Sequence, residues 1–316
     1  MNIQVIMEQM LVLFAMMLIG YFIWKKQWMD DNASVMLSKI VINIFNPLLV
    51  IYGVTGKSRG SDFALTMQNL GFMVFYYVLL ILISIPLILL LRPKKADKNI
   101  YRLMTIFANV GFMGIPVISS VFGQESIIYV AFYMLGYNIL LYTYGLFVAR
   151  QAGIDAGSDK VMVSQGVLND FKKLINPGVV ASLFAVLVFF FGITLPEPVV
   201  TFCDYVGNAT IPLSMLLIGI SIAKADLKSI FTNKKLYLFI FLRMIALPVC
   251  MALILRNFNF LDMAVGIFIL QLAMPVGTVT VLLAKENGAD ESFCTDGIVL
   301  TTLASIVTIP IAGLML

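Results

Sequence analysis

The sequence contains no histidine among its 316 residues, and this absence excludes several kinds of enzyme. A Ser-His-Asp triad, an HExxH zinc site and a histidine proton relay all require an imidazole side chain. The three cysteines, Cys203, Cys250 and Cys294, are far apart and form no CxxC pair, so neither a disulfide framework nor a metal cluster is indicated. We therefore expect a protein that is not an enzyme and that holds no cofactor.

Charged residues are also scarce. They make up 12% of the chain, against roughly 25% in a soluble domain, while 61% of the residues are hydrophobic and the mean hydropathy is +0.99. This composition predicts an integral membrane protein. The net charge of +4 is modest and the basic residues cluster in a few loops, which gives no indication of nucleic-acid binding.

Several apolar segments are long enough to cross about 30 Å of hydrocarbon. The first, Val5–Ile23, has no basic residue before it and is followed by Lys25 and Lys26, so we expect a retained span and not a signal peptide. The predicted fold class is an all-α polytopic membrane protein with ten transmembrane helices. We place these spans at roughly 4–24, 33–54, 66–91, 100–122, 126–150, 175–194, 202–223, 233–255, 262–284 and 290–314.

The distribution of lysine and arginine predicts the orientation of these spans. If the loops are assigned alternately to the two sides of the membrane, one side receives 16 basic residues and the other receives three. Cytoplasmic loops carry such an excess of positive charge. We therefore expect a multi-pass protein of the plasma membrane with both termini on the extracytoplasmic side.

The longest predicted loop divides five spans from five. We predict a first five-helix repeat at 1–150, a cytoplasmic linker at 151–174 and a second five-helix repeat at 175–316. Because five is odd, the second half enters the membrane from the opposite side, so any similarity between the halves is an inverted repeat.

Matches between the halves occur at a shift of about 165 residues. Asn46-Pro47 corresponds to Ile211-Pro212, and the segment Gly123–Ser126 resembles Gly288–Ser292. Pro116 pairs with Pro275 at a slightly shorter shift, which places both prolines in the fourth span of a half.

The fourth and ninth predicted spans contain glycine and proline in their middle, where a straight helix is expected. Proline has no N–H and clashes with the preceding turn, and glycine weakens a helix. Irregular backbone at membrane depth survives only inside protein or against a water-filled cavity. We therefore predict two broken helices that cross near mid-membrane, with the breaks at Gly111, Gly114 and Pro116 in ANVGFMGIP and at Pro275 and Gly277 in QLAMPVGTVTVLLAK.

Such breaks suit an anion, because the start of each second half-helix presents free N–H groups and about half a positive charge. The nearest polar side chains are Asn109, Gln271, Thr278 and Thr280 in the broken spans and Asn138 and Tyr142 in the fifth span. For the first of these, ligand binding is the favoured interpretation. For Gln271, Thr278 and Thr280, ligand binding and helix-to-helix hydrogen bonding are equally open. For Asn138 and Tyr142, packing is favoured.

Arg243, in the middle of the eighth span, is the deepest cation in the chain. Charged residues at membrane depth are costly and are functional by default. Arg243 either neutralises a substrate carboxylate or donates to carbonyls freed by the break in the ninth span, and we favour the second role. An intramembrane aspartyl protease is disfavoured, because the sequence shows no evident second aspartate that could act with Asp296.

The two break motifs also carry a family resemblance. ANVGFMGIP followed by Val117, and LAMPVGTVTVLLAKE, resemble the paired signatures of the auxin efflux carrier family, which includes the plant PIN transporters and their bacterial relatives. INPGVVASL at Ile175–Leu183 and Tyr142-Thr143 add weaker matches, so the similarity extends over nearly all of the chain. The long hydrophilic central loop of many plant members is absent, which points to a bacterial-type carrier.

The resemblance implies a scaffold of spans 1, 2, 6 and 7 and a transport domain of spans 3–5 and 8–10, with the substrate at the crossing of spans 4 and 9. It also implies an elevator-type mechanism, a homodimer in the lipid bilayer and a small organic anion, such as malate or malonate, as substrate. Two alternatives stay open. One is a sodium-coupled symporter of larger amphipathic anions, and the other is a membrane sensor that binds an anion without moving it.

Overall fold

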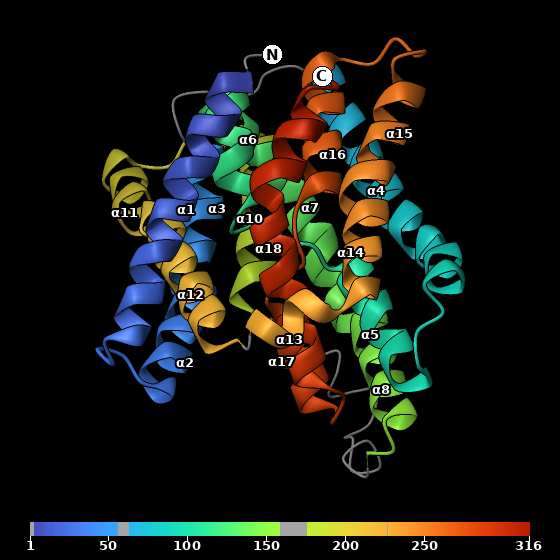
Figure 1. Cartoon of the computed structure of the whole chain (residues 1–316). Coiled ribbons are helices and arrows are strands. Elements are labelled where there is room, and N and C mark those ends of the chain that lie inside the picture. Colours follow the sequence, from blue (N-terminus) through green and yellow to red (C-terminus); the bar gives the residue numbers. More distant parts are fainter. Residues whose placement is uncertain (1–2, 56–62, 159–175, 226) are drawn as a thin grey trace.

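A computed structural model gives the arrangement of the chain as a bundle of helices (Figure 1). It describes residues 3–55, 63–158, 176–225 and 227–316. The predicted loop that contains Lys57 and Arg59, and most of the predicted linker at 151–174, lie outside the described residues.

Helices are the main secondary structure of the described part of the chain. In its first half the elements are α1 (Ile3–Lys25), α2 (Asp31–Ile40), η1 (Val41–Phe45), α3 (Asn46–Thr55), α4 (Phe63–Leu91), α5 (Lys95–Ile106), α6 (Gly114–Phe122), η2 (Gln124–Ser126), α7 (Ile127–Leu140), η3 (Leu141–Gly145) and α8 (Leu146–Asp155). In its second half they are α10 (Pro177–Phe191), α11 (Glu197–Asn208), α12 (Thr210–Lys224), α13 (Leu227–Thr232), α14 (Lys234–Ile240), η5 (Phe241–Ala246), α15 (Leu247–Leu255), α16 (Asp262–Ala273), α17 (Val279–Glu286) and α18 (Glu291–Gly313). The elements η1, η3 and η5 are π-helical turns inside longer helices.

Membrane-spanning character follows from the length and composition of these helices. Three of the ten expected spans are not formed by one long helix. In these, α10 has 15 residues, and the segments at 100–122 and 262–284 are each divided into two helices. The prediction of an all-helical polytopic membrane protein is confirmed, while the count of ten spans stays a prediction. In the described residues, seven helical segments are long and apolar enough to cross a membrane: Gln4–Lys25, Asp31–Thr55, Phe63–Leu91, Gln124–Asp155, Glu197–Lys224, Lys234–Leu255 and Glu291–Gly313.

The helices form two groups, which Figure 1 shows on opposite sides of the view. One group contains α1, α2, α11 and α12, in which α1 packs along α12. The other contains α4, α5, α8, α14 and α15, in which α5 packs on both α4 and α8. The helix α3 packs against α10 and α11, and α16 packs against α4, α15 and α18.

The outer surface of the bundle is apolar. On α1 and α4, the side chains of Leu11, Phe22 and Leu89 are 65%, 59% and 70% exposed. An apolar surface of this extent is unusual on a soluble monomer and is suited to contact with lipid tails.

Two glycines set the distance between α1 and α12. A Cβ atom at Gly20 would lie 2.0 Å from the carbonyl oxygen of Leu216, and one at Gly219 would lie 1.9 Å from that of Met17. Lipid tails are as apolar as leucine, so helices in a membrane associate through close packing, which small residues permit. The contact between α1 and α12 therefore depends on these two positions.

We expect Gly219→Ala to lower the free energy of unfolding by about 1–3 kcal/mol, because the added methyl group must push the two backbones apart. Thermal unfolding of the detergent-purified protein measures the effect. Gly71→Ala in α4 is the matched control, since nothing lies within 4 Å of a Cβ atom there. Equal unfolding temperatures for the two variants would show that the α1–α12 contact is looser than described.

The crossing of two interrupted segments and the pocket beside it

Two of the expected spans, at 100–122 and 262–284, are each interrupted between two helices, and the two interruptions lie against each other. The helix α5 ends at Ile106 and α6 begins at Gly114, while α16 ends at Ala273 and α17 begins at Val279. Between them, Ala108 and Val276 form an antiparallel bridge. The N–H of Asn109 donates to the carbonyl oxygen of Pro275 at 2.7 Å, and the N–H of Gly277 donates to that of Phe107 at 2.9 Å.

Glycine is favoured at one point of this bridge. A Cβ atom at Gly277 would lie 3.0 Å from the carbonyl oxygens of both Phe107 and Ala108, which are backbone atoms of the opposite segment. Pro275 has no N–H, so it contributes only its carbonyl group to the bridge, and the N–H on this side comes from Gly277. The sequence Pro275-Val-Gly277 thus favours an extended approach of two backbones where a helix would otherwise continue.

Side chains from neighbouring helices complete the hydrogen bonding of the crossing. Arg243 in η5 donates from Nε to the carbonyl oxygen of Thr105 at 2.9 Å and from Nη1 to that of Leu272. These are among the last carbonyl groups of α5 and α16, which have no partner within their own helices. The side chain of Arg243 therefore joins the ends of both helices.

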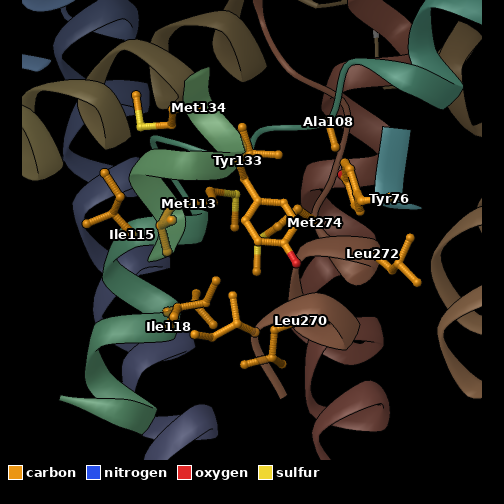
Figure 2. Packing of buried hydrophobic residues seen from close by; sticks show 14 of the residues in the cluster. Tyr76, Ala108, Met113, Ile115, Ile118, Tyr133, Met134, Leu270, Leu272 and Met274 are labelled. Atoms are coloured by element: carbon orange, nitrogen blue, oxygen red, sulfur yellow. The ribbon is translucent and has the colours of Figure 1, made fainter. Parts of the chain in front are cut away.

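Three further side chains bond to the same region. The hydroxyl of Tyr76 donates to the carbonyl oxygen of Gln271 at 3.3 Å, and the hydroxyl oxygen of Thr301 accepts from the N–H of Val276 at 3.1 Å. The Nε2 of Gln271 donates to the carbonyl oxygen of Val110 at 3.3 Å. Figure 2 shows Tyr76, Ala108 and Leu272 on one side of the buried cluster. Met113, which precedes α6, lies on the other side with Ile115 and Ile118 of α6.

A cavity of about 110 Å³ adjoins the crossing. Four asparagines, two tyrosines and backbone of both interruptions line it, and none of the described lining residues is charged. A second hollow of about 260 Å³ shares Tyr142, Asn176 and Val279 with the first and extends to Glu286 at the end of α17. The first cavity is lined by Ile42, Asn46, Ala108, Asn109, Val110, Gly111, Phe112, Met134, Tyr137, Asn138, Leu141, Tyr142, Asn176, Gly178, Gly277, Thr278 and Val279.

Asn109 has the geometry of a ligand donor. Asn109 is 6% exposed. Its Oδ1 accepts from the N–H of Phe112 at 3.1 Å, which fixes the orientation of the side-chain amide. Its Nδ2 has no hydrogen-bond partner among the described residues, and Asn109 is one of the residues that line the cavity. This amide group can donate to a ligand without breaking a bond within the protein.

The start of α17 also faces the cavity, whereas the start of α6 is occupied. The amides of Thr278 and Val279 have no partner in the part of the chain that the structure describes, and both residues line the cavity. At α6, the N–H groups of Gly114 and Ile115 donate to the carbonyl oxygens of Asn109 and Gly111, at 3.2 and 3.0 Å. The sequence predicted free amides at both helix starts. At α6 the first amides are instead bonded to carbonyl groups of the tight turn that precedes the helix.

The structure brings together half of the residues that the sequence predicts for the site. Asn109, Gly111, Asn138, Tyr142, Gly277 and Thr278 line the cavity. The remaining six do not line it: Gly114, Pro116, Gln271, Pro275, Thr280 and Arg243. Most of these six contact the backbone of the crossing. Gln271 lies against Gly114, and the carbonyl oxygen of Pro275 accepts from the N–H of Asn109. The hydroxyl of Thr280 donates to the carbonyl oxygen of Gly277 at 2.8 Å.

Sequence reasoning did not select two of the asparagines, Asn46 and Asn176. Asn46 is the first residue of α3, and the Oδ1 of Asn176 caps α10 by accepting from the N–H of Val179 at 3.1 Å. The sequence holds two Asn-Pro pairs. Asn176-Pro177 stands at the start of α10, whereas Asn46-Pro47 follows η1 inside the continuous helical segment Asp31–Thr55. Proline is common in the first turn of a helix and asparagine before it, so the pair at Asn176 was a usable signal, and the pair at Asn46 was not.

The fold and this arrangement define an all-helical membrane protein with an uncharged, amide-rich cavity next to interrupted backbone. A family model described as "Membrane transport protein" matches residues 5–312. The chain therefore belongs to this membrane transport protein family, which is the auxin efflux carrier family, and the resemblance noted in the sequence is confirmed. It is a transporter and not an enzyme.

Two similar proteins are described as uncharacterized transporters. The chain is 25% identical over 318 residues to an uncharacterized transporter of Methanocaldococcus jannaschii, and the match covers 98% of each chain. It is 24% identical over 315 residues to an uncharacterized transporter of Methanothermobacter thermautotrophicus, again over 98% of each chain.

We expect Thr301→Val to lower the free energy of unfolding by about 1–3 kcal/mol, because the N–H of Val276 would lose its acceptor in a buried place. Thermal unfolding of the purified protein measures the loss. The matched control is Thr295→Val on the same helix, where the hydroxyl bonds only to the carbonyl oxygen of Glu291 in its own helix. If Thr295→Val lowers the free energy of unfolding as much as Thr301→Val does, the loss arises from the helix itself and not from the crossing.

Proposed function

We propose that this transporter carries small organic anions of the malate or malonate type by secondary-active, alternating-access transport. The observation that supports the substrate class is the cavity at the crossing, where neutral donors converge and the Nδ2 of Asn109 is unpaired within the described protein. Hydrogen bonds to a charged group contribute about 1.5–3 kcal/mol each. Two or three such bonds give an affinity in the micromolar to millimolar range, which lets a carrier release its cargo.

We further propose ten spans in a 5+5 inverted repeat, with halves at 1–150 and 175–316 joined by the linker. Two features support this arrangement. The interruptions fall in the fourth span of each half, and the packing of span 1 (α1) on span 7 (α12) has its inverted counterpart in the packing of span 6 (α10) on span 2 (α3).

The hydrogen bonds at the crossing support a division into two bodies. They connect α4, α5, η5, α16 and α18, which belong to spans 3, 4, 8, 9 and 10. We propose that these spans, with span 5, form the moving transport domain, and that spans 1, 2, 6 and 7 form a scaffold through which two copies assemble as a homodimer. The transport domain then shifts against the scaffold in the manner of an elevator, and both termini lie outside the plasma membrane.

Asn109→Asp tests the site. It replaces a neutral donor by a negative charge of the same shape, so we expect anion affinity to fall at least about 10-fold, corresponding to the loss of one hydrogen bond to a charged group. Counterflow of labelled malonate and malate in proteoliposomes measures transport. Asn257→Asp is the control, because Asn257 is exposed at the end of α15 and is remote from the cavity lining.

The results separate the alternatives. Counterflow that is lost in Asn109→Asp and kept in Asn257→Asp supports the proposal, whereas equal activity of both variants contradicts it. Flux that requires sodium and prefers larger amphipathic anions would favour the symporter. Saturable binding without any flux would favour a sensor.

A further inference from the structure

Arg243 is the only charged side chain among the described buried residues, at 2% exposure. Arginine stays protonated in proteins, so its positive charge is permanent. It donates to the carbonyl oxygens of Thr105 and Leu272 and interacts with the side chain of Tyr76, and it does not line the cavity. No described acidic residue is as deeply buried, so no described carboxylate of comparable depth accompanies this charge.

The charge of a bound anion and the charge of Arg243 would lie at different ends of the interruptions. An anion in the cavity would lie near Asn109 and the start of α17, where the lining is neutral. Arg243 lies at the ends of α5 and α16, which are the opposite ends of the same interruptions. A full positive charge at these two helix ends matches the roughly half negative charge that each of them carries.

Arg243 is also fixed to the elements that form the site. Its two bonds hold one interrupted segment each, and Thr105 and Leu272 lie within five residues of the bridged pair, Ala108 and Val276. Any movement that carries the crossing through the membrane must carry this guanidinium group as well.

We infer that Arg243 is the counter-charge of the transported anion and travels with it, so that the body loaded with a monoanion is electrically neutral and the empty body carries one positive charge. The inference rests on the proposed function and concerns which step of the cycle senses the membrane potential. Moving one charge through the whole field changes an equilibrium about 50-fold per 100 mV. Under this scheme that change applies to the return of the empty carrier.

The test uses the full-length protein in proteoliposomes whose membrane potential is set by a potassium gradient and valinomycin. The probe is labelled malonate, at a pH between its two acid constants where the monoanion predominates. We expect malonate exchange to be equal within about twofold at zero and at about −100 mV inside. Net malonate efflux without external anion should rise severalfold at the negative potential, because the positive empty carrier is drawn back to the inside.

Exchange that changes more than about fivefold with the potential would overturn the inference, since a loaded body that senses the field is not neutral. That result would leave the proposed transport function intact, because malonate would still be exchanged. Absence of malonate flux under every condition would instead overturn the proposed function, and this inference with it.

Two variants separate charge from structure. Arg243→Lys keeps the charge, and Arg243→Gln removes it while leaving a donor of similar reach. We expect exchange to stay independent of voltage in the lysine variant and to become dependent in the glutamine variant, whose loaded body would be negative. A merely structural role would slow both variants without changing the voltage dependence of either. If the glutamine variant does not fold, the wild-type comparison of exchange with net efflux decides alone.

Discussion

The structure depends on one constraint, which is that hydrogen-bonding groups of the backbone must find partners inside the protein when they lie within a membrane. Two segments of this chain leave the helical ladder, and each supplies partners for the other. The bridge between Ala108 and Val276 satisfies groups of both. Side chains of Arg243, Tyr76 and Thr301 satisfy much of the remainder, so three surrounding helices are joined to the crossing by polar bonds in an otherwise apolar bundle.

The same interruptions make a cavity possible. A continuous helix would direct its amides along its own axis, whereas the interrupted chain turns the amides of Thr278 and Val279 and the side chain of Asn109 toward one space. The lining is neutral, so a ligand anion would be held by dipoles and amide donors, which bind it less tightly than a direct ion pair would. Moderate affinity suits a protein that must release what it binds.

Expectations from the sequence succeeded or failed for a physical reason. Composition and long apolar runs predicted an all-helical membrane protein, because transfer to hydrocarbon depends on average hydrophobicity and tolerates errors of single residues. The residues chosen for the site were less accurate. Gln271 and Thr280 are polar and near the interruption, yet the rotation of their helices turns them toward the protein, while Asn46 and Asn176 come from distant segments and enter the cavity lining.

The sequence by itself determined the class of protein, its family and the places where glycine and proline weaken a helix, since these are properties of composition, of motif and of local backbone energy. Only the tertiary structure decided that residues 107–109 pair with residues 275–277, that four asparagines share one cavity and that Arg243 joins α5 to α16. These are contacts between segments more than 100 residues apart in most cases. They follow from how helices rotate and pack against one another, which no single segment specifies alone.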